Sequence, residues 1–148
     1  MEQKDKELLL KYLCMALSYD LQVKVEGDNE PYTLLSVHPN KDIALIGIDM
    51  DGVYATSKVK IDTIKPYLRP MSSMTEEEEK EFNEQMYNAK PYSDGKSYNV
   101  YEVIGLDINY LNAHHFDYFG LIEKGCAIRV TEDNNPYKIV EEQIWKQI

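Results

Sequence analysis

The feature that most restricts how this chain can fold is a change in the spacing of its apolar residues, from a helical period to a period of two. The stretch "LQVKVEG" alternates apolar and polar side chains, as a half-buried strand does. Three more strand-like runs follow, separated by tight polar turns: "YTLLSVH", "IALIGID" and "VYATSKVKI". Residues 21–61 therefore predict a four-stranded antiparallel meander. Because such a sheet curls, we expect a small, SH3-like barrel or a sheet covered by a helix.

The helices of the first half are predicted from the 3.6-residue period and from capping signals. Leucines recur at helical spacing between residues 4 and 18, so an amphipathic helix precedes the sheet and packs on another element. After the meander, Pro66 and Pro70 predict a segment without regular structure. In "TEEEEKEF", Thr75 and Glu78 have the spacing of a capping box. The glutamate run therefore indicates a helix start rather than a catalytic cluster.

The second half is predicted to be mainly helical. A helix is expected over about 100–115, with one apolar stripe formed by Val100, Ile104, Ile108, Leu111 and His115. Asp117 is expected to cap a short helix that Gly125 ends, "CAIRV" predicts a late strand, and a final helix starts at Asn135. The fold class is α+β in a single domain, residues 1–148, with a helix and the meander in 1–70 and mainly helices in 71–148.

Charge and composition limit the partners. The chain has 26 acidic and 16 basic residues and a net charge of −10, which repels phosphate backbones and anionic membranes. We therefore expect neither a nucleic-acid nor a membrane partner. The sequence "MEQKDKELLLKYL" shows no cleavage site and is too short in apolar residues to span a bilayer, which predicts a cytoplasmic location. Cys14 and Cys126 are expected to be small buried hydrophobic residues.

Two motifs resemble catalytic or metal-binding sites, and the more specific of them is "IALIGIDMDGVY". An apolar strand followed by Asp-x-Asp-Gly-Val resembles the first motif of the haloacid-dehalogenase-like phosphatases. That resemblance implies Asp49 as nucleophile and Asp51 as general acid/base, beside a magnesium ion. The family has a parallel sheet with helices between its strands, however, whereas here a strand-like run begins directly after Gly52. Asp51-Gly52 between two strand-like runs favours a β-hairpin without catalysis.

The second motif is the pair of adjacent histidines in "NAHHFDYFG". His114 and Asp117, with the distant His38, would supply three metal ligands at most. Neighbouring residues of a helix point about 100° apart, so His114 and His115 cannot share a metal ion as an i,i+4 pair does. We expect His115 at the edge of the core and His114 on the other face. The motif therefore predicts a helix end.

The chain is rich in tyrosine, with 12 residues of this type. Several crowd its centre: Tyr87, Tyr92, Tyr98, Tyr101 and Tyr110. Few basic residues lie between them, which argues against stacking on nucleobases. Tyrosine is a common anchor at protein interfaces, so these residues indicate either a protein-binding surface or the rim of a small core.

Two stretches, "KPYLRPMSSMTEEEEKEF" and "LNAHHFDYFGLIEKG", together resemble a group of small uncharacterised proteins encoded in prophages and mobile elements of gut anaerobes. The chain departs from that group at Phe119, where arginine is more usual, and in its final helix. The resemblance implies a small accessory protein in a phage-associated setting. It transfers no catalytic residue.

We therefore expect a non-enzymatic accessory protein that binds another protein. The sequence assigns no catalytic residue, metal ligand or cofactor, and it leaves the oligomeric state open. One alternative is a metal-dependent, phosphatase-like hydrolase that uses Asp49 and Asp51, or His114 and Asp117. A second is an acidic mimic of DNA that inhibits a nucleic-acid-binding protein. A thermal shift with divalent metal ions would favour the first, and competition by DNA would favour the second.

Overall fold

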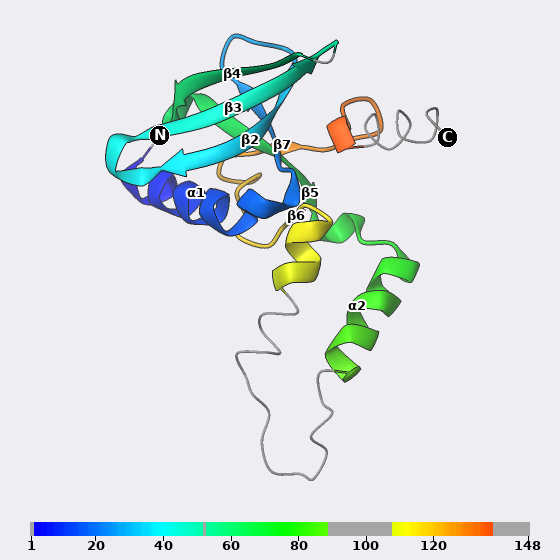
Figure 1. Ribbon diagram of the computed structural model, residues 1–148. Helices are drawn as coiled ribbons and strands as arrows, with labels where there is room; N and C mark the ends of the chain where they lie inside the picture. Colours follow the sequence, from blue (N-terminus) through cyan, green and yellow to red (C-terminus); the bar gives the residue numbers. More distant parts are fainter. Residues whose placement is uncertain (1, 52, 89–107, 138–148) are drawn as a thin grey trace.

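The computed structural model describes residues 2–51, 53–88 and 108–137, and these form an α+β fold in which α1 packs beneath a twisted sheet (Figure 1). The helices are α1 (Gln3–Ala16) and α2 (Glu76–Asn88), and residues 108–113 are also helical. The strands are β1 (Gln22–Val25), β2 (Pro31–His38), β3 (Ile43–Met50), β4 (Val53–Lys60), β5 (Ile64–Pro70), β6 (Phe116–Asp117) and β7 (Ile128–Arg129). The predicted α+β class and N-terminal helix are confirmed.

The sheet contains the predicted meander and extends it on one side. Strands β1 to β4 pair antiparallel in sequence order, as expected. The order across the sheet is β4-β3-β2-β1-β5-β6, and β7 also pairs with β5. β5 is antiparallel to β1, whereas β6 and β7 are parallel to β5. The sheet thus has seven strands rather than four, and with β4 and β6 at its two ends the SH3-like barrel is not confirmed.

Strand β5 corrects the expectation that Pro66 and Pro70 prevent regular structure. A hydrogen bond from Glu26 N to Thr63 O (2.8 Å) sets the phase of the ladder between β1 and β5. Hydrogen-bonded and non-hydrogen-bonded pairs alternate along an antiparallel ladder, so the pair of Val23 and Pro66 is a non-hydrogen-bonded one. The proline therefore removes no donor from the ladder with β1, and its fixed φ is compatible with a strand.

Helix α1 is attached to the sheet by apolar burial. Its fully buried side chains, each 0% exposed, are Leu9, Tyr12, Leu13 and Ala16. They pack with Val23 of β1 and with Ile64 and Leu68 of β5 in the main hydrophobic cluster. Cys14 lies outside this helical stripe and is exposed, so the expectation that it is buried is wrong. The same expectation is confirmed for Cys126, which packs in the main cluster.

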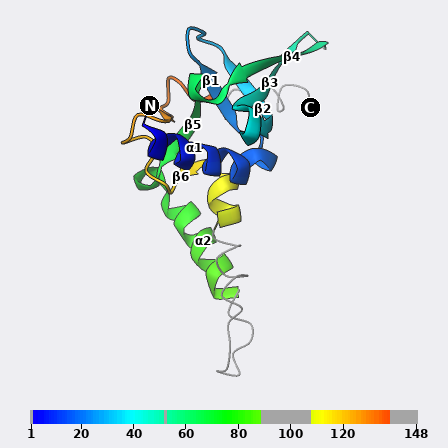
Figure 2. The ribbon, with the colours of Figure 1, turned by 90° about the vertical axis from the view of Figure 1, so that its left-hand side faces the viewer.

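Helix α2 begins with the predicted capping box. Thr75 N donates to Glu78 Oε1 (3.1 Å), and Glu78 N donates to Thr75 Oγ1 (3.1 Å). The Glu78 carboxylate also accepts two hydrogen bonds from the Arg69 guanidinium, at 2.7 and 2.6 Å. Hydrogen bonding to Arg69 lowers the pKa of Glu78 to about 2. Beyond its first turn the helix runs away from the sheet, and its remaining glutamates are exposed (Figure 2).

The part after residue 107 differs most from expectation. Of the helix predicted over 100–115, residues 100–107 lie outside the described residues. The short helix expected after Asp117 is wrong, because residues 121–125 form turns and Gly120, with a φ of 73°, interrupts any helix there. Asp117 still acts as a cap, accepting hydrogen bonds from Leu121 N (2.8 Å) and Ile122 N (2.9 Å). The late strand is confirmed as β7, and the final helix lies outside the described residues after residue 137.

Candidate functional site

The Asp-x-Asp-Gly motif begins at the end of β3, which contains Asp49 and Met50, and continues into the turn before β4, where Asp51 lies. The register pairs Asp49 with Tyr54 and Met50 with Val53. Asp51 has a φ of 52° and is exposed at the tip. Two-residue hairpin turns require positive φ, and aspartate tolerates it better than most residues. The hairpin prediction is therefore confirmed, and Asp51, the general acid/base that the phosphatase resemblance implied, lies exposed in the turn.

The two residues of the second motif that were candidate metal ligands, His114 and Asp117, contact different partners. His114 Nδ1 lies 3.3 Å from the Glu78 carboxylate, and its ring stacks on Tyr110 with centroids 4.3 Å apart. Asp117 instead uses both carboxylate oxygens to cap the following turn. His38 is at the end of β2, where its Nε2 is 3.1 Å from Ser36 Oγ. Among the described residues, no group of three or more His, Cys, Asp or Glu could hold a metal ion.

His115 ends the helix of residues 108–113, in agreement with the prediction. Its φ is 61°, and its ring is half-buried and stacks on Tyr137 with centroids 3.7 Å apart. His115 Nε2 lies 2.8 Å from Tyr19 O, and burial lowers the pKa of the imidazole. The Tyr137 hydroxyl donates to Tyr67 O (2.8 Å) and accepts from Gln22 N (3.1 Å). The hydroxyl thus bridges the backbones of β1 and β5 beyond their last direct pair.

Of the central tyrosines, Tyr110 has a structural role. It is 5% exposed, and its hydroxyl donates to Glu78 O (3.0 Å) and lies 3.1 Å from Glu81 Oε2. It therefore connects the helix of residues 108–113 to α2 instead of presenting a surface for a partner. Tyr92, Tyr98 and Tyr101 lie outside the described residues.

The most exposed apolar surface among the described residues is on β4. Seven of the eight residues of this strand are exposed, with Val53 at 69% and Tyr54 at 50%. Val53 and Ala55 are exposed because α1 does not extend beneath the tip of the hairpin (Figure 1). Only Val59, near the other end of the strand, packs against the main cluster.

The backbone of β4 also has a free side. A hydrogen bond from Ile61 N to Asp42 O (3.2 Å) continues the β3–β4 register and marks a hydrogen-bonded pair. By alternation, Thr56 lies between two such pairs, so its N–H and C=O point away from β3. β4 is the terminal strand in the sheet order, and within the described part of the chain no strand pairs with this side.

A glycine on β3 positions the exposed aromatic ring of β4. A Cβ at Gly47 would lie 2.6 Å from Cε1 of Tyr54 and 2.8 Å from Cδ1 of Leu35. The Tyr54 ring therefore lies directly over the glycine backbone, and a side chain at this position would displace it. Lys58 and Lys60 stand farther along β4, on the same face of the strand as Tyr54.

Sequence reasoning identified β4 as a strand but did not identify it as an exposed edge. Two signals could have done so. The run "VYATSKVK" contains no strongly apolar row, and its lysines are of the kind that natural proteins place on unpaired edges. The uncharged half, Val53–Ser57, lacks that protection.

Comparison with known proteins found no matching protein-family model, curated protein or solved structure. A search of the described residues for a helix both long and apolar enough to cross a membrane found none.

Proposed function

We propose that this protein is a non-enzymatic accessory protein that binds another protein by adding an extended segment of its partner to β4. The observation that carries the proposal is the free side of an eight-residue terminal strand whose side chains are almost all exposed. Addition of a strand satisfies the outward N–H and C=O groups, and the side chains of alternate residues supply specificity.

Charge and apolar surface define the partner segment. The half of β4 near the hairpin turn offers Val53 and Tyr54, which suit apolar side chains. The other half offers Lys58 and Lys60, which suit acidic side chains. The partner segment is therefore extended, apolar at one end and acidic at the other. The resemblance to prophage proteins supports a phage-associated, cytoplasmic setting for this interaction.

The proposal is tested by capturing partners from host lysate on wild-type protein, Thr56→Pro and Thr56→Val. Proline removes the outward N–H of Thr56 without removing a β3–β4 hydrogen bond, whereas valine keeps it. We expect a stoichiometric protein that the wild type and Thr56→Val retain and Thr56→Pro loses. Thermal unfolding of all three proteins checks that the hairpin is intact. A partner retained equally by Thr56→Pro contradicts the use of this edge.

The same preparations separate the two alternatives. Nuclease treatment during capture, followed by competition with DNA, tests the acidic mimic, which would use the exposed glutamates of α2. Thermal shifts with magnesium, manganese and zinc test the hydrolase, and any shift should disappear in Asp51→Asn or His114→Ala if those residues bind the metal ion.

A further inference from the structure

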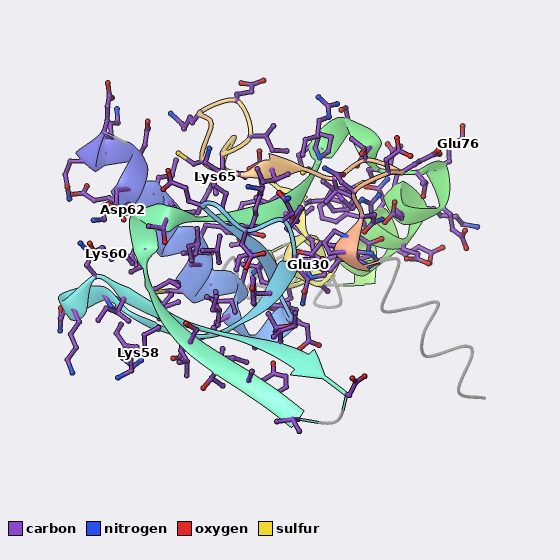
Figure 3. The ribbon with its side chains drawn as sticks, turned by 90° about the horizontal axis from the view of Figure 1, so that it is seen from above. Glu30, Lys58, Lys60, Asp62, Lys65 and Glu76 are labelled. Atoms are coloured by element: carbon purple, nitrogen blue, oxygen red, sulfur yellow. The ribbon has the colours of Figure 1, made fainter. Side chains whose placement is uncertain are left out.

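A cleft of about 370 Å³ lies between the N-terminal end of α1, the C-terminal end of β1, the start of β5, and the turn that precedes β7. The charged residues that line it are Asp5, Lys24, Glu26, Asp62, Lys65 and Lys124. In Figure 3, Asp62 and Lys65 are labelled near the start of β5, away from the exposed tip of the β3–β4 hairpin. The cleft is therefore separate from the uncharged half of β4.

Two lysines of the cleft are direct neighbours on the adjacent strands β1 and β5. Lys24 of β1 is the register partner of Lys65 of β5. The hydrogen bond from Glu26 N to Thr63 O places this pair at a hydrogen-bonded position, with both side chains on the same face. Like charges directly opposite each other destabilise a sheet, and within the described part of the chain neither lysine has a carboxylate within 4.0 Å. Neither ammonium group is therefore occupied by an ion pair with a described residue, and both are available to a negatively charged ligand.

A third ammonium group comes from the turn before β7. β7 pairs Ile128 with Tyr67, which brings the residues just before it alongside the start of β5. Lys124 lines the cleft there, and its Nζ is 3.8 Å from Asp5 Oδ1. Lys65, Lys124 and Cys126 line the cleft together, and burial raises the pKa of the Cys126 thiol.

We propose that this cleft binds the phosphate group of a small phosphomonoester that also carries hydroxyl groups, such as a sugar phosphate. Lys24, Lys65 and Lys124 hold the phosphate, whose two negative charges match a set of ammonium groups better than one carboxylate would. Glu26 and Asp62 accept hydrogen bonds from the hydroxyl groups. The volume of the cleft suits a small molecule.

The surrounding charge selects for a small ligand. Asp5, Glu26 and Asp62 line the same cleft as the lysines, and the whole chain carries a net charge of −10. An extended polyanion such as a nucleic acid would meet all of these carboxylates, whereas a single phosphate group at the lysines would meet mainly Asp5, which lies beside Lys124.

The proposal is tested by isothermal titration calorimetry at low ionic strength, with inorganic phosphate, glucose 6-phosphate and glucose as probes. The test variant is Lys24→Gln/Lys65→Gln, and the matched control is Lys41→Gln/Lys80→Gln, two exposed lysines outside the cleft and outside β4, which changes the net charge equally. We expect saturable binding of both phosphates to wild type and control, at least tenfold weaker binding to the test variant, and none of glucose. Because the test variant removes a like-charge pair, its melting temperature without ligand should not fall.

Two outcomes would overturn the proposal: absence of saturable phosphate binding to the wild type, or equal weakening in both variants, which would show a general charge effect. Equal affinity for inorganic phosphate and glucose 6-phosphate would overturn the hydroxyl contacts assigned to Glu26 and Asp62. Tighter binding of glucose 6-phosphate that is lost in Glu26→Gln would support them.

Discussion

Helices α1 and α2 are similar in length, but they are attached to the sheet by different forces. α1 contributes four fully buried side chains to the main hydrophobic cluster. α2 is attached through the Glu78 carboxylate, which meets Arg69, Thr75 and His114, and through Phe82, whose ring packs on Tyr110 with centroids 5.6 Å apart. The first attachment depends on apolar area, which is insensitive to pH and salt, whereas the second combines a small apolar contact with hydrogen bonds to a charged carboxylate, which are sensitive to pH. The two helices should therefore respond differently to the same perturbation.

The largest effect is expected from Leu13→Ala in α1. Leu13 is 0% exposed, and truncating it leaves a cavity between the helix and the sheet. We expect a loss of about 2–5 kcal/mol in the free energy of unfolding, measured by chemical denaturation. Hydrogen exchange should accelerate throughout α1 and the sheet. Acceleration limited to α1 would contradict a single cooperative unit of helix and sheet.

A smaller and more local effect is expected from Arg69→Met. The substitution removes the two hydrogen bonds to Glu78 and leaves that carboxylate, whose side chain is 14% exposed, without its main partner. Hydrogen bonds to charged groups contribute about 1.5–3 kcal/mol, so α2 should detach at a cost of that order. Amide exchange in residues 76–84 should accelerate while exchange in α1 stays unchanged. Adding Glu78→Gln should recover part of the loss.

Acidification should separate the two helices without any mutation. The pKa of Glu78 in the folded protein, about 2, is below its ordinary value of 4.5, so its stabilising effect is complete above pH 4.5 and is lost as the pH falls toward 2. Exchange in α2 should therefore accelerate over this range, and Glu78→Gln should remove most of the pH dependence. The pKa of His115 is also lowered from its ordinary value of 6.5, so its contribution to the stability of the sheet, on which it packs through Tyr137, is lost as the pH falls below 6.5.

The smallest effect is expected from His114→Ala. The His114 side chain is 36% exposed, so its contact with Glu78 is largely solvated. Surface ion pairs and a partly exposed ring stack contribute little, and we expect a loss of at most about 1 kcal/mol in the attachment of α2. Exchange in residues 76–84 measures it. A loss as large as that of Arg69→Met would show that the histidine, rather than the guanidinium, holds the helix.

The contrast between the helices also explains which predictions succeeded. Local patterns determine α1, the first four strands, the Asp51 turn and the capping box at Thr75, because each of these depends on neighbours in the sequence. β5 was missed because the effect of Pro66 depends on the phase of its pairing with Val23, which local sequence does not reveal. The predicted helix after Asp117 is wrong because Gly120, with a φ of 73°, interrupts a stretch whose apolar spacing is compatible with a helix.

The candidate sites depended even more on long-range contacts. The hairpin tip at Asp51 was predictable, but the exposure of Val53 depends on where α1 ends beneath the sheet. The pairing of Lys24 with Lys65 joins strands separated by the whole meander. No spacing rule in the sequence places these two lysines together, so only the fold reveals the cleft.

The bridge made by Tyr137 has a consequence for the timing of folding during synthesis. Its hydroxyl bonds to Gln22, 115 residues earlier, and to Tyr67, 70 residues earlier. Strands β1 and β5 leave the ribosome well before it does, so an amide and a carbonyl between them stay hydrated until then. A nascent chain that has not yet released residue 137 therefore carries a sheet in which β1 and β5 lack this bridge.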